Sequence, residues 1–400
     1  MKNHLVLRAS VLAAFLIFCL LPIAAHATTS CTAIVGINFY SSINDALAAL
    51  GAGPGVIFVT GTCTESVQIN NVRSVTIDGF SGAAVVGPLD SDAFDISQSQ
   101  NIVLGDMDIG GTFSTTGNGG GAGVVVTEAS DVHIVRCHIH DNQVVGVDAD
   151  TGSQLFLRDT IIERNTPFDG LDVYDNSTVG VVGSTIQFNG SLGTGGTAGV
   201  FVARDSVIRF GGGGETNYVQ YNADLGIEVR NLSNAVFGAG GVTIQGNGTT
   251  GVSVETGSHL QVNGPKTIIQ GNGAACPADP TCGGISATQD STVTLDVGTV
   301  SGNQGSGISA QQGASITVGA PTPSLGTATV TNNSGDGVHI QWLSSAKINS
   351  GNTITGNGGA SISCDDDSLA IGDLSVYTKV RCAEVESPSG HEHEDKDNRR

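Results

Sequence analysis

Basic residues are scarce in this 400-residue chain, which has 16 Lys and Arg against 37 Asp and Glu and a formal net charge of −21. A surface with this balance repels nucleic acid and anionic lipid, so these two classes of partner are excluded. It also repels acidic polysaccharides, unless a divalent cation bridges the two. A divalent cation such as calcium is therefore the only cofactor that we expect from the composition.

Long hydrophobic runs are absent after residue 21. The run at residues 11–21 follows Lys2 and Arg8 and is well short of the ~20 residues that span a bilayer. With small residues at Ala25 and Ala27, it is typical of a signal peptide cleaved after Ala27. Loss of two bases then leaves 14 bases against 37 acids, a charge of −23. We therefore predict a secreted protein, periplasmic in a Gram-negative host, without membrane insertion.

Seven of the eight Cys follow the predicted cleavage site, and export allows them to form disulfides. Connectivity does not follow from the sequence alone. Proximity in the chain predicts the pairs Cys31–Cys63, Cys276–Cys282 and Cys364–Cys382. Cys137 is left without a partner.

A frame of Gly and Asn recurs along the chain, although few other side chains are repeated. Each unit begins at a Gly followed by an apolar residue and ends at an Asn. The nine units begin at Gly123, Gly146, Gly170, Gly199, Gly226, Gly251, Gly284, Gly307 and Gly337, and end at Asn142, Asn165, Asn189, Asn222, Asn247, Asn272, Asn303, Asn333 and Asn357. Variable spacing between fixed landmarks indicates loops of different length on a constant core.

Apolar and polar residues alternate inside each unit with a period of two, which predicts three short strands with one apolar face each. Three strands per unit make one coil of a parallel β-helix, with neighbouring coils about 4.8 Å apart. We expect the closing Asn to adopt the left-handed corner conformation and to bond the Asn of the next coil. Cys137 falls on an inward position of this pattern, so we predict a buried, inert thiol.

This repeat resembles the right-handed parallel β-helix superfamily, which includes pectate lyases and polygalacturonases. The resemblance covers residues 56–383 and implies an all-β solenoid of about eleven or twelve turns. Residues 1–27 are then a signal peptide, 28–55 a cap and 384–400 a polar tail that we expect to be disordered. In the cap, residues 43–50 are predicted to form a short helix with Ser42 as N-cap, which covers the apolar end of the solenoid.

The catalytic signatures of these enzymes are absent from the sequence. Polygalacturonases carry Asn-Thr-Asp, Asp-Asp and Gly-His-Gly on successive turns, and here only the Asp run at 365–367 is present, without such partners. The Asp-His and Arg-rich motifs of pectate lyases and the Asp-Pro-His of alginate epimerases are absent as well. The resemblance therefore transfers no catalytic residue to this chain.

Outward positions of successive coils form columns, and two neighbouring columns make an acidic face. We predict Asp148 and Asp172 as a catalytic pair about 5 Å apart, as in a retaining glycosidase, with one pKa raised by the other carboxyl. The predicted sugar-binding residues around them, with the two rings as platforms, are Asp150, Tyr174, Phe201, Glu228 and Arg230. The alternative is a solvated acidic face on a very acidic protein.

A second candidate site lies on the strand that closes each unit. His138 and His140 point outward, and the alignment places Asp108 beside His138 and Glu163 beside His140. These four residues are predicted to bind a divalent metal, or to hold a His base beside an acid. The alternative is a charge-paired His patch, because no metal-ligand motif with defined spacing is present.

Two functions follow from these patterns. The first is a secreted monomer that contacts extracellular or cell-wall polysaccharide along its flank. If this protein is an enzyme, hydrolysis of a neutral or weakly charged glycan is favoured over lyase chemistry. The second is a non-catalytic surface or adhesion module that acts as a rigid rod. The long loops after Ile109, Asn189 and Asn272 distinguish the two, because loops folded over one face would turn that face into a cleft.

Overall fold

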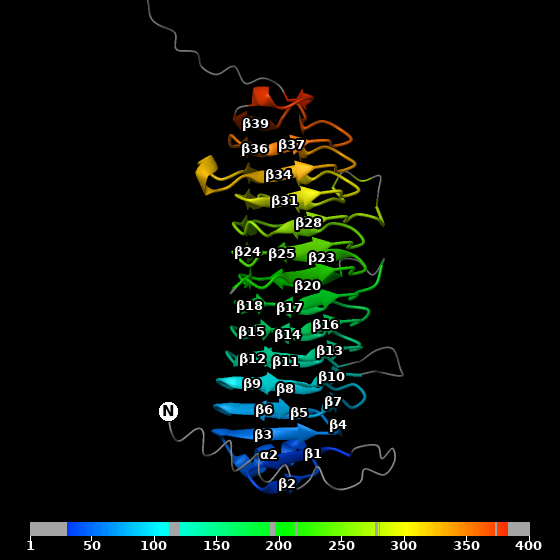
Figure 1. Cartoon of the computed structure of the whole chain (residues 1–400), viewed down its shortest axis with the longest axis vertical. Helices are drawn as coiled ribbons and strands as arrows, with labels where there is room; N and C mark the ends of the chain where they lie inside the picture. The colour runs from blue at the N-terminus through cyan, green and yellow to red at the C-terminus, as the bar shows by residue number, and fades with distance from the viewer. Residues whose placement is uncertain are drawn as a thin grey trace, which may run out of the picture.

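The computed structural model describes residues 30–111, 121–192, 197–212, 214–276, 279, 281–372 and 374–382. The chain is wound into a straight column of stacked coils, with the N-terminal cap at one end and the C-terminal elements at the other (Figure 1). The predicted signal peptide and polar tail lie outside the described residues. No helix within the described residues is long and apolar enough to cross a bilayer.

Three sheets form the sides of the column, and each coil contributes one strand to each of them. We call them the first, second and third sheet in the order in which a coil visits them. The first sheet contains β2 (Asn38–Tyr40), β1 (Thr32–Val35), β3 (Gly55–Thr60), β6 (Val75–Gly79), β9 (Ile102–Gly105), β12 (Asp131–Val135), β15 (Gln154–Arg158), β18 (Thr178–Val182), β21 (Val207–Phe210), β24 (Asn234–Phe237), β27 (His259–Val262), β30 (Thr292–Leu295), β33 (Ser315–Val318), β36 (Ser345–Ile348) and β39 (Leu369–Gly372). The strands of the coils run parallel, and the first sheet also contains the antiparallel strands β1 and β2 of the cap.

The other two sheets have the same order along the column. The second sheet contains β4 (Thr62–Thr64), β7 (Ala84–Val86), β10 (Asp108–Gly110), β13 (His138–His140), β16 (Ile161–Glu163), β19 (Thr185–Gln187), β22 (Asn217–Gln220), β25 (Val242–Gln245), β28 (Ile268–Gln270), β31 (Gly298–Ser301), β34 (Ala328–Thr331) and β37 (Thr353–Thr355). The third contains β5 (Val67–Asn70), β8 (Phe94–Ser97), β11 (Val124–Thr127), β14 (Val147–Ala149), β17 (Leu171–Val173), β20 (Ala198–Ala203), β23 (Leu225–Arg230), β26 (Val252–Val254), β29 (Ile285–Ala287), β32 (Ile308–Ala310), β35 (Val338–Ile340), β38 (Ile362–Cys364) and β40 (Val380–Arg381). The described residues therefore make 12 full coils, one for each strand of the 12-stranded second sheet.

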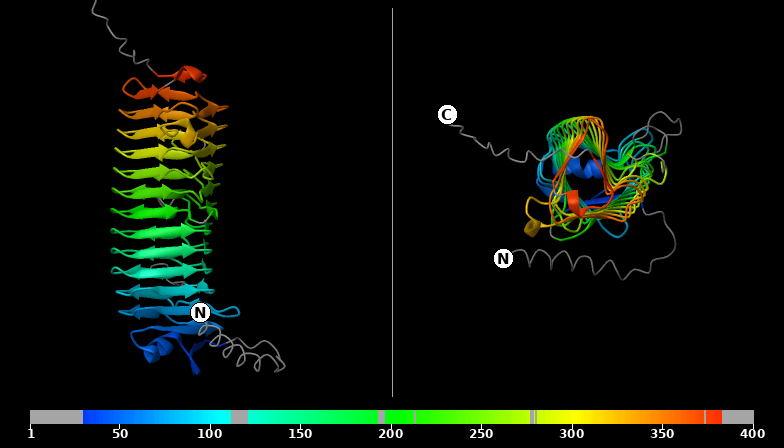
Figure 2. Two further views of the ribbon diagram at one scale, coloured as in Figure 1. Left: turned by 60° about the vertical axis from the view of Figure 1, so that its left-hand side comes forward. Right: turned by 90° about the horizontal axis from the view of Figure 1, so that it is seen from above.

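Inward side chains stack in register from coil to coil, as the view along the axis in Figure 2 shows for the backbone. Ile109, Ile139, Ile162 and Ile186 follow one another on neighbouring strands and are completely buried. Each buried Ile contributes about 1.5–3 kcal/mol relative to an exposed one. The period of two in the sequence is thus the period of a core that runs the whole length of the column. Cys137 is buried in it as a free thiol, as predicted, and burial raises its pKa to about 12.

The closing Asn residues form a buried ladder inside one corner. The Nδ2 atom of each donates to the Oδ1 atom of the next, from Asn142 through to Asn357, over 2.8–3.1 Å. The predicted left-handed conformation of these Asn residues is wrong. Positive φ belongs to the preceding residue, for example Phe188 at 56° and Tyr221 at 55°. The chain turns one residue earlier, so that the amide can point inward.

The Gly that begins each unit is required by the same corner. A Cβ atom on Gly146 would lie 2.5 Å from Ile162 Cγ2 and 2.7 Å from Asn165 Nδ2. On Gly170 it would lie 2.6 Å from Asn189 Nδ2. Gly and Asn recur together because the Asn ladder occupies the space that a side chain at the Gly position would need.

The N-terminal cap closes the lower end of the column. Helix α2 (Ile43–Leu50) begins after Ser42, whose side chain accepts a hydrogen bond from the Asp45 amide, as predicted. The carboxylate of Glu65, from the first coil, accepts hydrogen bonds from the amides of Ile43 (2.7 Å) and Asn44 (3.1 Å). Glu65 therefore provides acceptors for N–H groups that have no partner within the helix, and its negative charge is favourable at the helix N-terminus.

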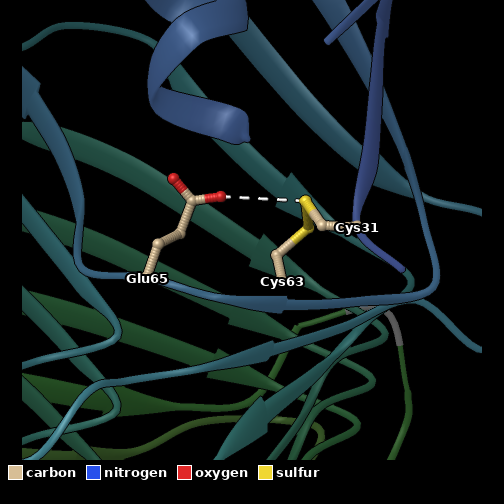
Figure 3. Close-up of side chains that lie close together, drawn as sticks. All are labelled: Cys31, Cys63 and Glu65. Atoms are coloured by element: carbon tan, nitrogen blue, oxygen red, sulfur yellow. Dashed lines mark hydrogen bonds between the residues drawn. A yellow bond between two sulfur atoms is a disulfide. The ribbon is translucent and has the colours of Figure 1, made fainter. Parts of the chain in front are cut away.

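The three predicted disulfides are present: Cys31–Cys63, Cys276–Cys282 and Cys364–Cys382. The first lies beside Glu65, with Cys31 Sγ 3.8 Å from Glu65 Oε1 (Figure 3). Both sulfur atoms form the disulfide, and the Glu65 carboxylate is hydrogen-bonded to the helix amides. We therefore interpret Cys31, Cys63 and Glu65 as structural residues. At the upper end, the third disulfide ties β38 to the segment after β40. The remaining short helices are η1 (Pro323–Leu325) and η2 (Leu374–Val376).

Candidate functional site

The predicted acidic column lies on the outer surface of the third sheet. Asp148, Asp172, Phe201 and Glu228 occupy neighbouring strands β14, β17, β20 and β23 and are direct partners in the register. The structure therefore brings together residues that are up to 80 positions apart in the sequence. Asp150 and Tyr174 follow the ends of β14 and β17, and Arg230 ends β23.

Asp148 and Asp172 are half-buried, and their side chains point away from the core. Each has an Oδ1 atom that is buried without a hydrogen-bond partner. Burial raises the pKa of Asp148 to about 7, and the charges of Asp150, Asp92 and Asp175 add to this effect. Burial also raises the pKa of Asp172 well above its usual range, followed by repulsion from Asp169 and Asp148. The Asp148 carboxyl is thus able to carry a proton near neutral pH.

Asp169 belongs to this cluster, and sequence reasoning missed it. It precedes Gly170, accepts a hydrogen bond from the Ala198 amide, and shares a hydrogen bond with Asp172. The signal that marks it is its place directly before a unit-opening Gly. Asp336 occupies the same place before Gly337 and accepts from the Ala360 amide at 2.6 Å.

The prediction that Phe201 is a sugar platform is wrong. Its side chain is only 2% exposed and packs against Ala198, Ala203 and Tyr174, with the Tyr174 ring centroid at 5.0 Å. The Arg230 guanidinium lies 4.3 Å above the Phe201 ring. The alignment placed Phe201 in the correct column, but it did not show that the Arg230 side chain from the next column covers its ring.

Two other predicted sugar-binding residues, Glu228 and Tyr174, are in contact with Arg side chains of the protein itself. Arg230 Nη1 lies 3.1 Å from Glu228 Oε1, yet burial still raises the pKa of Glu228 to about 7. The Arg204 guanidinium lies 5.6 Å from the Tyr174 ring centroid. Asp150 Oδ1 accepts from the Thr151 amide at 2.6 Å. The third-sheet face is therefore a packed cluster of acids and aromatic rings, and the tips of its flanking loops (112–120 and 193–196) lie outside the described residues.

The predicted His patch lies on the outer surface of the second sheet. In the register, Asp108 is opposite His138 and Glu163 is opposite His140, as the alignment predicts. The side chains differ from this pattern. Glu163 reaches diagonally to His138, with Oε1 3.1 Å from Nε2, and His140 Nδ1 lies 2.6 Å from Asp141 Oδ2. Asp108 Oδ1 lies 3.2 Å from His138 Nδ1.

A shallow groove further along the second sheet was missed from the sequence. Its lining residues are Tyr221, Gln245, Gly246, Gln270, Gly271, Ser301, Gly302 and Asn332. The Tyr221 ring stacks on the Phe188 ring with centroids 5.6 Å apart, and the two side chains are 47% and 49% exposed. Both rings stand directly before a closing Asn. That position, read down the nine units, is the signal that would have revealed the groove.

Residues 55–213 match the family described as right handed beta helix region. The three stacked sheets continue the same fold beyond the matched residues, so the described chain is a parallel β-helix. No curated protein matches the sequence.

The chain is similar to three solved structures at a low level. The A-module of mannuronan C-5 epimerase AlgE6 from Azotobacter vinelandii is 15% identical, with a TM-score of 0.44, over 82% of this chain and 93% of that one. PfbA, a surface adhesin of Streptococcus pneumoniae, is 11% identical with a TM-score of 0.43 over 80% and 87%. The AlgE4 A-module is 15% identical with a TM-score of 0.41 over 82% and 94%. Similarity at this level assigns no function to the chain.

Proposed function

We propose that this β-helix binds a neutral extracellular polysaccharide in the groove on its second sheet. The observation that carries the proposal is the exposed, stacked pair Phe188 and Tyr221 at the end of an uncharged groove. Aromatic rings present a flat apolar surface with a negative face, on which the C–H groups of a pyranose pack. Exposed aromatic rings beside a few fixed polar groups are typical of ligand sites.

The corner residues make the groove continuous along the column. The Tyr221 ring covers Gly246, where a Cβ atom would lie 2.6 Å from Cδ1 of the ring. On Gly271 and Gly302, in the following coils, a Cβ atom would have nothing within 4 Å. The space above Gly271 and Gly302 is therefore large enough for sugar rings next to Tyr221.

Gln245 and Gln270 line the groove and belong to a ladder of glutamine amides. Gln220, Gln245 and Gln270 each donate one Nε2 hydrogen to the Gln Oε1 of the preceding coil over 2.8–2.9 Å. Each amide keeps a second N–H for a ligand. Because the ladder already fixes the orientation of these amides, little side-chain entropy is lost when a hydroxyl binds.

The distribution of charge on the molecule favours a neutral glycan over an acidic one. None of the residues that line the groove is charged, whereas the chain as a whole carries −21. A neutral glycan meets no repulsion in this groove, but a polyuronate meets the field of the whole surface.

The test is a binding assay with the purified full chain against neutral polysaccharides and polygalacturonate, by calorimetry or affinity electrophoresis. Tyr221→Ala should weaken binding to the preferred neutral glycan at least about 10-fold, and Phe188→Ala should weaken it as well, because each removes a stacking surface. Phe168→Ala is the matched control, since that ring is 50% exposed outside the groove. Equal affinity of Tyr221→Ala and the wild type would overturn the proposal.

A second function, glycoside hydrolysis, is favoured by the half-buried carboxyls of Asp148 and Asp172. A carboxyl whose pKa is raised to about 7 suits a general acid at neutral pH. We expect reducing ends to appear when the protein is incubated with a neutral glycan that reaches the third sheet, and Asp172→Asn to abolish them. Binding without product in the wild type would leave the non-catalytic adhesion module as the function.

A further inference from the structure

We propose that Asp108, His138 and His140 form a binding site for a divalent cation of the Zn²⁺ type. The three side chains project from two adjacent strands of the second sheet, β10 and β13. One ligand atom from each lies within 4.8 Å of the other two, and the two imidazole centroids are 4.2 Å apart. All three side chains remain accessible to solvent, with exposures of 51%, 34% and 26% for Asp108, His138 and His140.

Each imidazole is already oriented by a carboxylate on its far side. Glu163 Oε1 lies 3.1 Å from His138 Nε2, and Asp141 Oδ2 lies 2.6 Å from His140 Nδ1. These contacts leave Nε2 of His140 and Nδ1 of His138 as the ligand atoms, and Nδ1 of His138 already lies 3.2 Å from the third ligand, Asp108 Oδ1. A carboxylate that accepts the second N–H of an imidazole is the usual support of a metal-bound His, because it fixes the tautomer and strengthens the donor.

The supporting carboxylates are themselves held in place. Arg164 contacts Glu163 through Nη1 and lies 3.2 Å from Asp141 through both Nε and Nη2. Gln187 Nε2 donates to the other Glu163 oxygen at 2.7 Å. Glu163 is therefore a supporting residue and not the metal ligand that the sequence suggested. A charge-paired surface His would not need a buried carboxylate that is itself held by two further side chains.

The donor set decides the class of ion. Two imidazole nitrogens and one carboxylate suit Zn²⁺ or Co²⁺, whereas Ca²⁺ takes six to eight oxygen ligands. Three protein ligands leave a position open for water or substrate. Within the described residues, the other comparable group is Cys31, Cys63 and Glu65, whose sulfur atoms are bonded to each other.

The test is titration of the full chain with Zn²⁺ by calorimetry and with Co²⁺ by visible absorption. The wild type should bind one ion at this site, and His138→Ala/His140→Ala should lose at least 100-fold in affinity. His133→Ala is the matched control, because that outward imidazole on β12 is outside the cluster. A His391→Ala/His393→Ala variant removes the His residues of the tail and should leave binding at the site unchanged.

Two conservative variants keep the test valid if the double variant fails to fold. Asp108→Asn changes an exposed ligand and leaves both imidazoles, so it should weaken Zn²⁺ binding in a folded protein. Glu163→Gln should keep the stoichiometry but weaken binding about 10- to 100-fold, the usual effect of losing a supporting carboxylate. Binding that disappears with the tail variant, or that survives in both Asp108→Asn and the double His variant, would overturn the proposal.

Discussion

Asn247→Ala is expected to lower the free energy of unfolding by about 3 kcal/mol, because it leaves buried hydrogen-bonding groups without partners. Asn247 Oδ1 accepts from both the backbone amide and Nδ2 of Asn222, each at 3.0 Å. Its own Nδ2 donates to the Val219 carbonyl and to Asn272 Oδ1. A buried donor that loses its partner costs about 1–3 kcal/mol, and alanine removes the acceptor of two donors at once.

The measurement is the midpoint of urea denaturation at neutral pH. Gln261→Ala serves as the control, since Gln261 lies on the outer surface of β27 and should change the free energy of unfolding by less than about 0.5 kcal/mol. If Asn247→Ala were as mild as this control, the Asn ladder would not be a main source of stability. The frame in the sequence would then need another explanation.

Asp148→Asn is expected to stabilise the protein at pH 8 by about 2–4 kcal/mol and to have little effect at pH 4. The folded-state pKa of Asp148 is raised to about 7, mainly by burial, whereas the unfolded chain titrates near 3.8. Between these values the folded protein keeps a proton that the unfolded chain has lost. The free energy of unfolding therefore falls as the pH rises from about 4 to about 7, and the amide removes this loss.

The pH dependence is measured as thermal unfolding of both proteins from pH 4 to pH 8. Asp90→Asn is the matched control, because that residue is exposed to solvent. A parallel pH profile for wild type and Asp148→Asn would show that Asp148 is ionised at little cost, and would remove the support for a general acid at this position.

The register of the coils could be predicted from the sequence because it depends on local rules. Gly and Asn landmarks, inward positions with a period of two, the helix after Ser42 and the Cys pairs are each set by neighbouring residues or by one corner geometry. Once the register is known, any outward residue can be assigned to its column. Asp148 and Asp172 were matched correctly in this way.

Side-chain direction could not be predicted from the same alignment. Glu163 is opposite His140 but reaches His138, and Arg230 bends back over Phe201 instead of extending into solvent. A long charged side chain can contact any of several neighbours, and the contact that it makes depends on the charges in the adjacent columns. The groove beside Tyr221 was missed for a different reason, since it is made by the lack of side chains at Gly271 and Gly302.

A stack of parallel coils has no natural last member, because each finished coil presents a row of free N–H and C=O groups to the next. In this protein β1 pairs in the antiparallel direction with both β3 and β2, so the stack ends there in a hairpin instead of another coil. The same chain therefore encodes both a repeating unit and the signal that stops it. This is what separates a rod of fixed length from a growing fibre.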